Sequence, residues 1–301
     1  MAMLITYDEA GRREDLLDLI TDVSPDDNPL MTMLGSAVAT NTLHEWMTDY
    51  IARPTTVTYQ AEGAEFTYDV LTAPARVNNI VANIRRTFQV SADERVVKIA
   101  GQADPFEYQA AKALRQWKMD AEYTVVNSAR ASGASGTARS MTGLNNAITT
   151  LATARNSGTS LSETEFQDMV QDSWSQAGSE YVFDLVLVPF GLKRKIDGFT
   201  AGATKLVDAS DKKLTAPVAV YETSGGMHRL FAHRDVLASA GSVTFFGIKE
   251  DLYKLAWFRK PERILVAKTG DNDKGALVGG FSLQWGAERS SVLRTGYATG
   301  G

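Results

Sequence analysis

The chain has 301 residues, of which 44% are hydrophobic and 22% are charged, and its formal net charge is −5. This composition is ordinary for a packed globular protein and excludes a fibrous or disordered chain. The sequence contains no cysteine, which excludes disulfides, thiolate metal sites and cysteine nucleophiles. The net charge argues against a dedicated nucleic-acid binder, because affinity for phosphates depends on surplus lysine and arginine.

The N-terminal segment lacks the pattern of a membrane or export signal. No apolar run approaches the roughly 20 residues that span a bilayer, and Asp8 and Glu9 come too early for a signal peptide. Residues 1–40 combine a short helical pattern with a turn-rich run at 24–29, whose two prolines prevent a continuous helix. We expect such a segment either to be mobile or to lie along a neighbouring chain.

Residues 42–91 have the pattern of extended structure. Between Ile80 and Val90, apolar and polar side chains alternate as in a half-buried strand, and only Arg86 interrupts the apolar face. We expect the run 43–51 to pair with this strand, with a turn at Glu62-Gly63 between them. Strands of roughly ten residues at about 3.3 Å each reach ~30 Å, so this arm is expected to leave the globule.

The clearest helix begins after Asp104. Asp104 is predicted to cap it, Pro105 suits its first position, and Glu107 would complete a capping box. Apolar residues then recur every three or four positions and predict one buried stripe that includes Leu114. The glycine-rich run 132–136 is the predicted stop, so the helix would have about 27 residues and a length of about 40 Å at roughly 1.5 Å per residue.

The second half of the chain alternates helices and strands. A helix capped by Ser162 is predicted at 162–177, then a buried strand at 182–188 and a short basic helix at 190–199. Further strands are predicted at 218–222, 242–246, 263–268 and 277–293, the last interrupted by Gly279-Gly280 and Gly286. The sequence therefore predicts the α+β class.

Patterns for catalysis and metal binding are missing from the sequence. Its three histidines are His44, His228 and His233, and the five-residue spacing of the last two disfavours a metal pair on a strand or a helix. No phosphate-binding glycine loop and no nucleophile elbow occurs. We therefore predict that the chain is not an enzyme and has no catalytic residue, no cofactor and no metal site.

Two charged features remain open to a functional interpretation. The basic clusters at 85–86 and 193–195 fit solvated faces better than contacts with phosphate or an acidic partner. Glu62 and Glu65, at the tip of the predicted arm, are interpreted as contacts to an arginine of a neighbouring chain. A cation site and two solvated acids are the alternatives.

Three stretches resemble the major capsid (major head) proteins of tailed bacteriophages. They are NTLHEWMTD at 41–49, which Glu62-Gly63 follows, VFDLVLVP at 182–189 and GFSLQWGAER at 280–289. The order of an N-terminal arm, a long hairpin, a long helix and an α+β lobe also resembles the Hong Kong 97-type (HK97-like) capsid fold of those phages.

This resemblance implies a division of the chain. Residues 1–41 would be the N-terminal arm, 42–91 the extended loop laid over an adjacent subunit, and 92–141 the peripheral domain with a spine helix at about 104–131. Residues 142–240 would form the axial domain, and 241–301 would hold the return strands. The inter-subunit contacts would come from Trp46, Asp49, Arg53, Glu62, Gly63, Glu65, Phe66, Tyr68, Arg85 and Arg86.

The implied function is a major capsid protein that assembles itself, as hexamers and pentamers, into an icosahedral shell around double-stranded DNA. Implied partners are copies of itself and portal, scaffolding and decoration proteins, with no membrane and no sequence-specific DNA binding. Assembly would occur in the host bacterial cytoplasm, and the product would be the virion. The alternatives are an encapsulin-like compartment shell, another virion component of the tail or decoration type, and an enzyme of unrecognised type.

Overall fold

The computed structural model describes residues 28–298 except 52, 58, 66–67, 69–72, 100–102, 200–219 and 237–241. Most of the predicted N-terminal arm and Phe66 therefore lie outside the described residues. The helices are α1 (Pro29–Met33), α2 (Ala92–Val96), α3 (Pro105–Asn127), α4 (Leu144–Ala147), α5 (Glu163–Ala177) and α6 (Phe190–Asp197). The strands are β1 (Gly35–Val38), β2 (Leu43–Thr48), β3 (Ala75–Ile80), β4 (Ala82–Ser91), β5 (Ala152–Thr159), β6 (Leu185–Val188), β7 (Val220–Thr223), β8 (Gly226–Ala232), β9 (Ser242–Ile248), β10 (Tyr253–Val266), β11 (Asn272–Trp285) and β12 (Val292–Ala298).

The chain divides into two compact units. Among the described residues, the first unit contains Arg85–Trp117 and Glu262–Val278, and the second contains the remainder. A six-stranded sheet in the second unit has the order β5-β12-β9-β6-β8-β7, β2 pairs with β3 alone, and the other four strands have the order β1-β10-β11-β4. No helix in the described ranges is long and apolar enough to cross a membrane.

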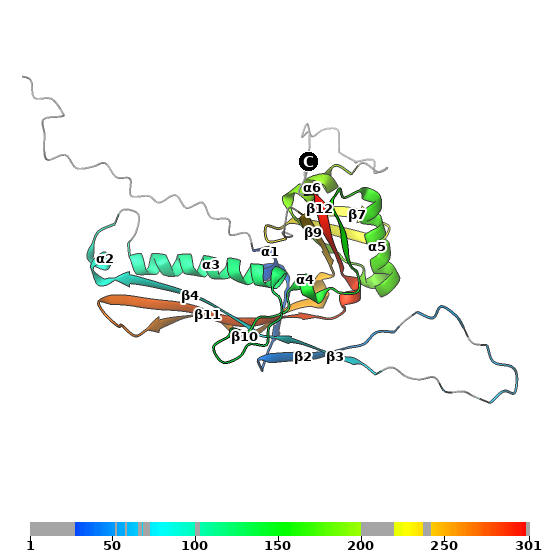
Figure 1. Ribbon diagram of the computed structural model, residues 1–301, viewed down its shortest axis with the longest axis horizontal. Helices are drawn as coiled ribbons and strands as arrows, with labels where there is room; N and C mark the ends of the chain where they lie inside the picture. The colour runs from blue at the N-terminus through cyan, green and yellow to red at the C-terminus, as the bar shows by residue number, and fades with distance from the viewer. Residues whose placement is uncertain are drawn as a thin grey trace, which may run out of the picture. The chain divides into compact units, whose positions relative to one another are not determined.

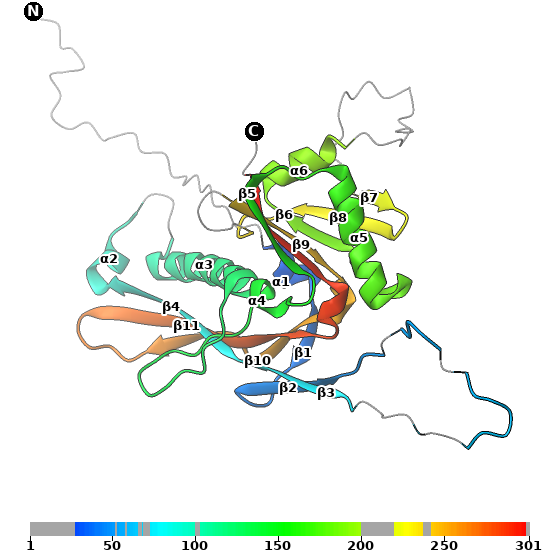
Figure 2. The ribbon, with the colours of Figure 1, turned by 45° about the vertical axis from the view of Figure 1, so that its right-hand side comes forward.

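The core of the second unit lies where α5 and α6 pack on the six-stranded sheet (Figure 2). The ring of Phe166 on α5 is fully buried and meets the rings of Phe183 and Phe245 edge to face, at 6.3 and 5.8 Å between centroids. The hydroxyl of Ser162 accepts the N–H of Glu165 at 3.2 Å and so caps α5 as predicted.

Helix α3 begins at Pro105, and the Asp104 carboxylate accepts the N–H of Phe106 at 2.9 Å, so the predicted start and cap are confirmed. Both oxygens of Glu107 accept hydrogen bonds from Arg263 at 2.8 Å, and its place in a capping box stays a prediction. The predicted stripe is buried except for Leu114, which is 38% exposed.

The predicted end of this helix was wrong by four residues, since α3 ends at Asn127. Ala131 and Ser140 exchange backbone hydrogen bonds at 3.1 and 3.0 Å, which draws 131–140 into a small hairpin. Gly133 and Gly136 adopt positive φ of 74° and 81° within it. The glycines thus favour a turn of the hairpin, and the helix has already ended before them.

The strand pairing in the extended region differs from the prediction. Strand β2 pairs antiparallel with β3, from Leu43 opposite Ile80 to Thr48 opposite Ala75, whereas residues 82–91 form β4 in the four-stranded sheet. Between the two strands lies Val81, which is fully buried and donates its N–H to the carbonyl of Thr42 at 2.9 Å. The chain changes sheets at Val81, and a continuous pattern of alternation does not reveal such a change.

The C-terminal strands also differ in extent. Strand β10 begins at Tyr253, ten residues before the predicted 263. The interruption predicted at Gly279-Gly280 does not occur, since both residues lie within β11, but the one predicted at Gly286 divides 277–293 between two strands, β11 and β12. They are separated at Gly286, where an added Cβ would lie 3.2 Å from the side chain of Leu252. Strand β8 was not predicted at all.

The buried Phe166 is expected to carry much of the stability of the second unit. Replacing Phe166 by Ala should lower the free energy of unfolding by about 3–5 kcal/mol, because a fully buried ring leaves a cavity. Phe190, which is 70% exposed, is the matched control, and Phe190→Ala should change stability by less than ~0.5 kcal/mol. Urea unfolding measures both values, and equal losses would contradict this placement of the core.

Candidate functional site

The β2–β3 hairpin continues into a long extension between its two strands (Figure 1). Large apolar side chains on its described part face solvent: Ile51 is 91% exposed, Tyr59 88% and Tyr68 95%. Burial of such residues is strongly favoured, so exposed groups of them mark surfaces that contact another molecule. The extension is therefore the first candidate for an intermolecular contact.

The tip of the extension turns at the predicted position. Ala64 donates its N–H to the carbonyl of Ala61 at 3.1 Å, and Gly63 adopts a φ of 77°, which glycine allows without strain. Glu62 and Glu65 are both exposed beside this turn.

The root of the hairpin is fixed by a buried amide. Asn79 is fully buried, its Oδ1 accepts the N–H of Thr142 at 2.8 Å, and its Nδ2 donates to the carbonyls of Thr142 and Leu283 at 3.1 and 2.8 Å. One side chain thereby satisfies backbone groups of two other segments, each of which would be costly to bury without a partner.

Aromatic contacts support the same root. The rings of Trp46 and Trp285 meet edge to face at 5.1 Å, and the guanidinium of Arg289 lies 4.2 Å from the ring centre of Tyr50. Cation–π contacts of this kind contribute about 0.5–1 kcal/mol at exposed sites. Trp46, which the sequence suggested as a contact to another subunit, is thus half-buried against its own subunit.

The other predicted contact residues fall into two groups. Those on the hairpin and its extension are exposed: Asp49, Arg53, Glu62, Gly63, Glu65 and Tyr68. Arg85 and Arg86 are also exposed, but they lie on β4, in the other unit of the chain. The hairpin and its extension therefore carry the first set, and the two arginines belong to a different strand.

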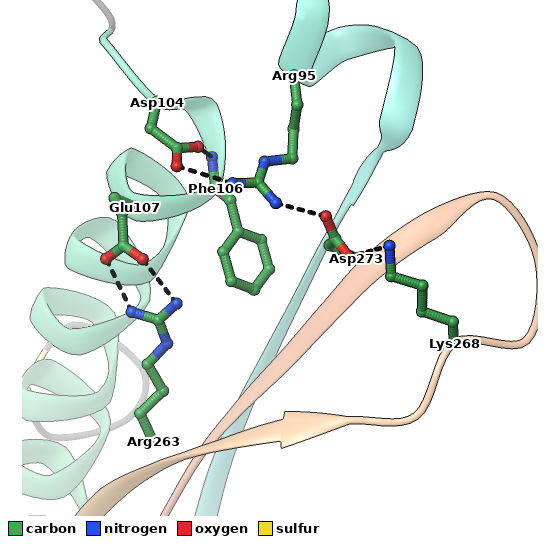
Figure 3. A network of polar contacts seen from close by, with 7 residues as sticks. All are labelled: Arg95, Asp104, Phe106, Glu107, Arg263, Lys268 and Asp273. Carbon is green, nitrogen blue, oxygen red and sulfur yellow. Dashed lines mark hydrogen bonds and ion pairs between the residues drawn. The ribbon is translucent and has the colours of Figure 1, made fainter.

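The first unit carries a polar network that sequence patterns did not indicate (Figure 3). Arg95 of α2 donates to Asp273 at 2.6 Å and to Asp104 at 3.0 Å, and Lys268 donates to the same Asp273 at 2.6 Å. These groups are 5 to 178 residues apart in the sequence, so only folding could reveal the network.

The acids of this network are held in their charged form. The hydrogen bond from Arg263 lowers the pKa of Glu107, the N–H of Phe106 lowers the pKa of Asp104, and Lys268, followed by Arg95, lowers the pKa of Asp273. A carboxyl pKa that is lower in the folded state stabilises the fold above the unfolded pKa of about 4, and this contribution is lost as the pH falls through the folded pKa. Because Glu107 is exposed and Asp104 and Asp273 are partly exposed, solvent screens the effect.

The second unit buries a different polar cluster. The carboxylate of Glu122 on α3 is fully buried, and it accepts the N–H groups of Leu30 and Met31 at 2.8 and 3.0 Å and Nε2 of His233 at 2.8 Å. Nδ1 of His233 accepts the N–H of Asp235 at 3.1 Å, so Nε2 carries the ring proton. Burial, with a smaller contribution from Glu122, raises the pKa of Asp235.

Sequence reasoning missed Glu122, although it weighed His233 as a metal ligand. One sign of its burial was present in the sequence. Glu122 comes one residue after Ala121 and three before Val125, so it lies at the edge of the apolar stripe of the helix. His228 lies apart from this cluster, with Nδ1 2.8 Å from the carbonyl of Phe183. Across the described ranges, no three acidic or histidine side chains gather as a metal site would require.

A family model described as SU10 major capsid protein matches residues 4–298. The chain belongs to this family. A curated relative, the major capsid protein of Escherichia phage Phieco32, is 23% identical to the SU10-family chain over 120 residues, which make up 40% of this chain. The match spans about a third of that relative's length (34%).

Solved structures resemble the SU10-family chain over nearly its whole length. The capsid of cyanophage A-1(L) gives a TM-score of 0.69 at 14% identity and covers 95% of this chain and 97% of that one. The capsid of Myoviridae phage XM1 gives 0.67 at 14% identity, with 96% and 100% covered. An encapsulin complex from Synechococcus elongatus gives 0.59 at 9% identity, with 96% and 93% covered.

These findings confirm the predicted family and the HK97-like α+β fold. Membership in a family of capsid proteins also makes this chain a structural protein, in agreement with the prediction that it is not an enzyme.

Substitution of two adjacent asparagines, Asn78 and Asn79, tests whether the buried amide stabilises the root of the hairpin. Asn79→Ala should lower the free energy of unfolding by about 1–3 kcal/mol, because it leaves buried backbone groups without a partner. Asn78 is the control, since its buried Oδ1 has no hydrogen-bond partner among the described residues, and Asn78→Ala should cost less. Thermal unfolding compares the two, and a larger loss at Asn78 would contradict the role of Asn79.

The polar network of the first unit should make stability depend on pH. Glu107→Gln removes one acid whose pKa is lowered, so this variant should lose less stability than the original protein between about pH 7 and about pH 3. Glu65→Gln, at an exposed position of the loop, should follow the original protein. Urea midpoints at several pH values provide the measurement, and parallel curves for Glu107→Gln and the original protein would disprove the assignment.

Proposed function

We propose that this chain is the subunit that builds the icosahedral head of a tailed bacteriophage and encloses its double-stranded DNA without recognising sequence. Family membership supports the proposal. The observation that carries it is the hairpin extension, which exposes Ile51, Tyr59 and Tyr68 while its root is tied to the body through Asn79. An arm with a fixed root and an apolar exposed surface is suited to bind a neighbouring copy.

In this proposal, residues 1–41 are the N-terminal arm and 42–91 the extended loop. Residues 92–141 form the peripheral domain, 142–240 the axial domain and 241–301 the return strands. Two observations support the assignment of the loop and the spine: the paired strands β2 and β3 within 42–91, and the 23-residue helix α3 within 92–141.

The relative strength of the contacts follows from their chemistry. Exposed ion pairs contribute about 0–1 kcal/mol each, so Glu62, Glu65 and Arg53 would mainly set orientation. Burial of apolar surface contributes about 25 cal/mol per Å², so the exposed tyrosines and Ile51 would supply most of the affinity. Closed symmetry repeats each such contact many times, and modest contacts then suffice for a stable shell.

The proposed contact set is the one that the sequence suggested, to which we add Ile51 and Tyr59 because their side chains are exposed. The residues that the sequence suggested are Trp46, Asp49, Arg53, Glu62, Gly63, Glu65, Phe66, Tyr68, Arg85 and Arg86. Of these, Trp46 would act from within its own subunit, by holding the root of the loop against Trp285. The copies would form hexamers and pentamers, with portal, scaffolding and decoration proteins as further partners and the host bacterial cytoplasm as the place of assembly.

An encapsulin-like shell around a protein cargo is the second candidate, and the similarity to the Synechococcus encapsulin complex favours it. Nucleic acid inside particles purified from infected cells would support the phage head, and a protein cargo without DNA would support the second candidate.

Deletion of residues 55–75 should leave a soluble, folded protein that no longer forms shells, because the exposed contact surface is removed and the core is not. Intact particles from this deletion in electron micrographs would refute the proposal.

A matched set of substitutions keeps the loop at full length. Replacing Ile51, Tyr59 and Tyr68 together by Ser should strongly reduce the yield of shells, whereas Glu62→Gln with Glu65→Gln should reduce it less. Sedimentation of assembly reactions measures the yield. The reverse order of effects would show that charge pairing, and not apolar burial, dominates the contact.

A further inference from the structure

The cluster around Glu122 joins three parts of the second unit that are distant in sequence. Its carboxylate lies on α3, its two backbone donors belong to α1, and its third donor is His233, which follows β8. Leu30 is 92 residues and His233 is 111 residues away from Glu122 along the chain. All of these groups lie in the same compact unit.

The geometry of α1 makes this carboxylate an important partner. The first N–H groups of any helix have no acceptor within the helix, and α1 is only five residues long. At its start, Asn28 provides no side-chain cap. Glu122 accepts the N–H groups of Leu30 and Met31, which lie in the first turn, and so replaces a cap from outside the helix.

The carboxylate in turn depends on these donors. It has no exposure to solvent, and a buried carboxylate is costly unless hydrogen bonds surround it. The side chains of His233 and Glu122 are 1% and 0% exposed, so water cannot readily replace either partner. If α1 moved away from α3, two N–H groups and one carboxylate oxygen would lose their partners together.

We infer that Glu122 is the positioning residue that fixes the start of α1 against α3, and that it makes α1 move with the part of α3 around Glu122 and not separately from it. Asn28, the first described residue, is thereby held at one place beside α3. The consequence for shells rests on the proposed function, because an arm that is to reach a neighbouring copy needs a defined starting point.

The test measures anchoring on unassembled subunits and assembly separately. In Glu122→Gln the amide group cannot accept all three donors, so hydrogen exchange of peptides covering residues 28–34 should accelerate at least about tenfold, while peptides from α5 and β6 keep their rates. Unchanged exchange at 28–34 in a folded variant would overturn the inference. Glu122→Asp retains the charge but is one methylene shorter, and it serves for the same measurement if the Gln variant does not fold.

Glu165→Gln is the matched control. Glu165 is also a buried glutamate of the same unit, 8% exposed, and it lies on α5, where it accepts from the hydroxyl of Tyr297 at 2.8 Å. The Glu165→Gln variant should have lower thermal stability but an unchanged rate of hydrogen exchange at residues 28–34. Faster exchange at these residues in Glu165→Gln would show that a general loss of stability causes the effect, and it would overturn the inference.

Assembly is then scored by electron microscopy. Malformed or absent shells for Glu122→Gln, with regular shells for Glu165→Gln, support the consequence for the arm. Regular shells from Glu122→Gln, despite rapid exchange, overturn that consequence. Failure of the unsubstituted protein to form shells would count against the proposed function, and not against the anchoring of α1.

Discussion

Asn79 forms hydrogen bonds to backbone groups of two other segments from the base of the β2–β3 hairpin, and the placement of the hairpin depends on this buried amide. A hairpin that leaves a folded body has no core of its own, and a two-stranded hairpin alone is marginally stable in water. Its direction must therefore be set at the root. The Trp46–Trp285 contact adds apolar burial at the same place.

The two units are stabilised by different interactions. The second has an apolar core in which the rings of Phe166, Phe183 and Phe245 meet edge to face. The described part of the first unit joins its helix ends and strands through exposed ion pairs around Arg95 and Asp273, and Phe106 packs beneath Arg263 at 5.0 Å. Apolar burial is little affected by pH, whereas these acids lose their charge in acid, so the ion-pair network of the first unit should weaken as the pH falls.

The buried polar side chains described above hold distant segments of the chain in place, and none of them is assigned to a chemical reaction. Glu122 and Asn79 are fully buried, and each satisfies backbone groups of segments far away in the sequence. In the proposed function the subunit presents arms to its neighbours, so accurate placement of the roots of those arms would be the main structural requirement.

Local patterns were sufficient wherever neighbouring residues decide the structure. The caps of α3 at Asp104 and of α5 at Ser162, the run of buried residues in β6 and the turn at Glu62-Gly63 were all predicted correctly, because helix ends and tight turns depend on residues within a few positions. The resemblance of three short stretches then indicated the family and the fold, and both are confirmed.

Tertiary structure alone decided which strand pairs with which and which polar side chains are buried. The change of sheet at Val81, the burial of Glu122 and the network around Arg95 all depend on partners that lie far away along the chain, up to 178 residues for Arg95 and Asp273. A period-2 pattern shows that a strand has a buried face, but it does not show which strand lies beside it. A glutamate in a helix has the same local pattern whether its oxygens meet water or the backbone of another segment, and only the folded chain distinguishes these two environments.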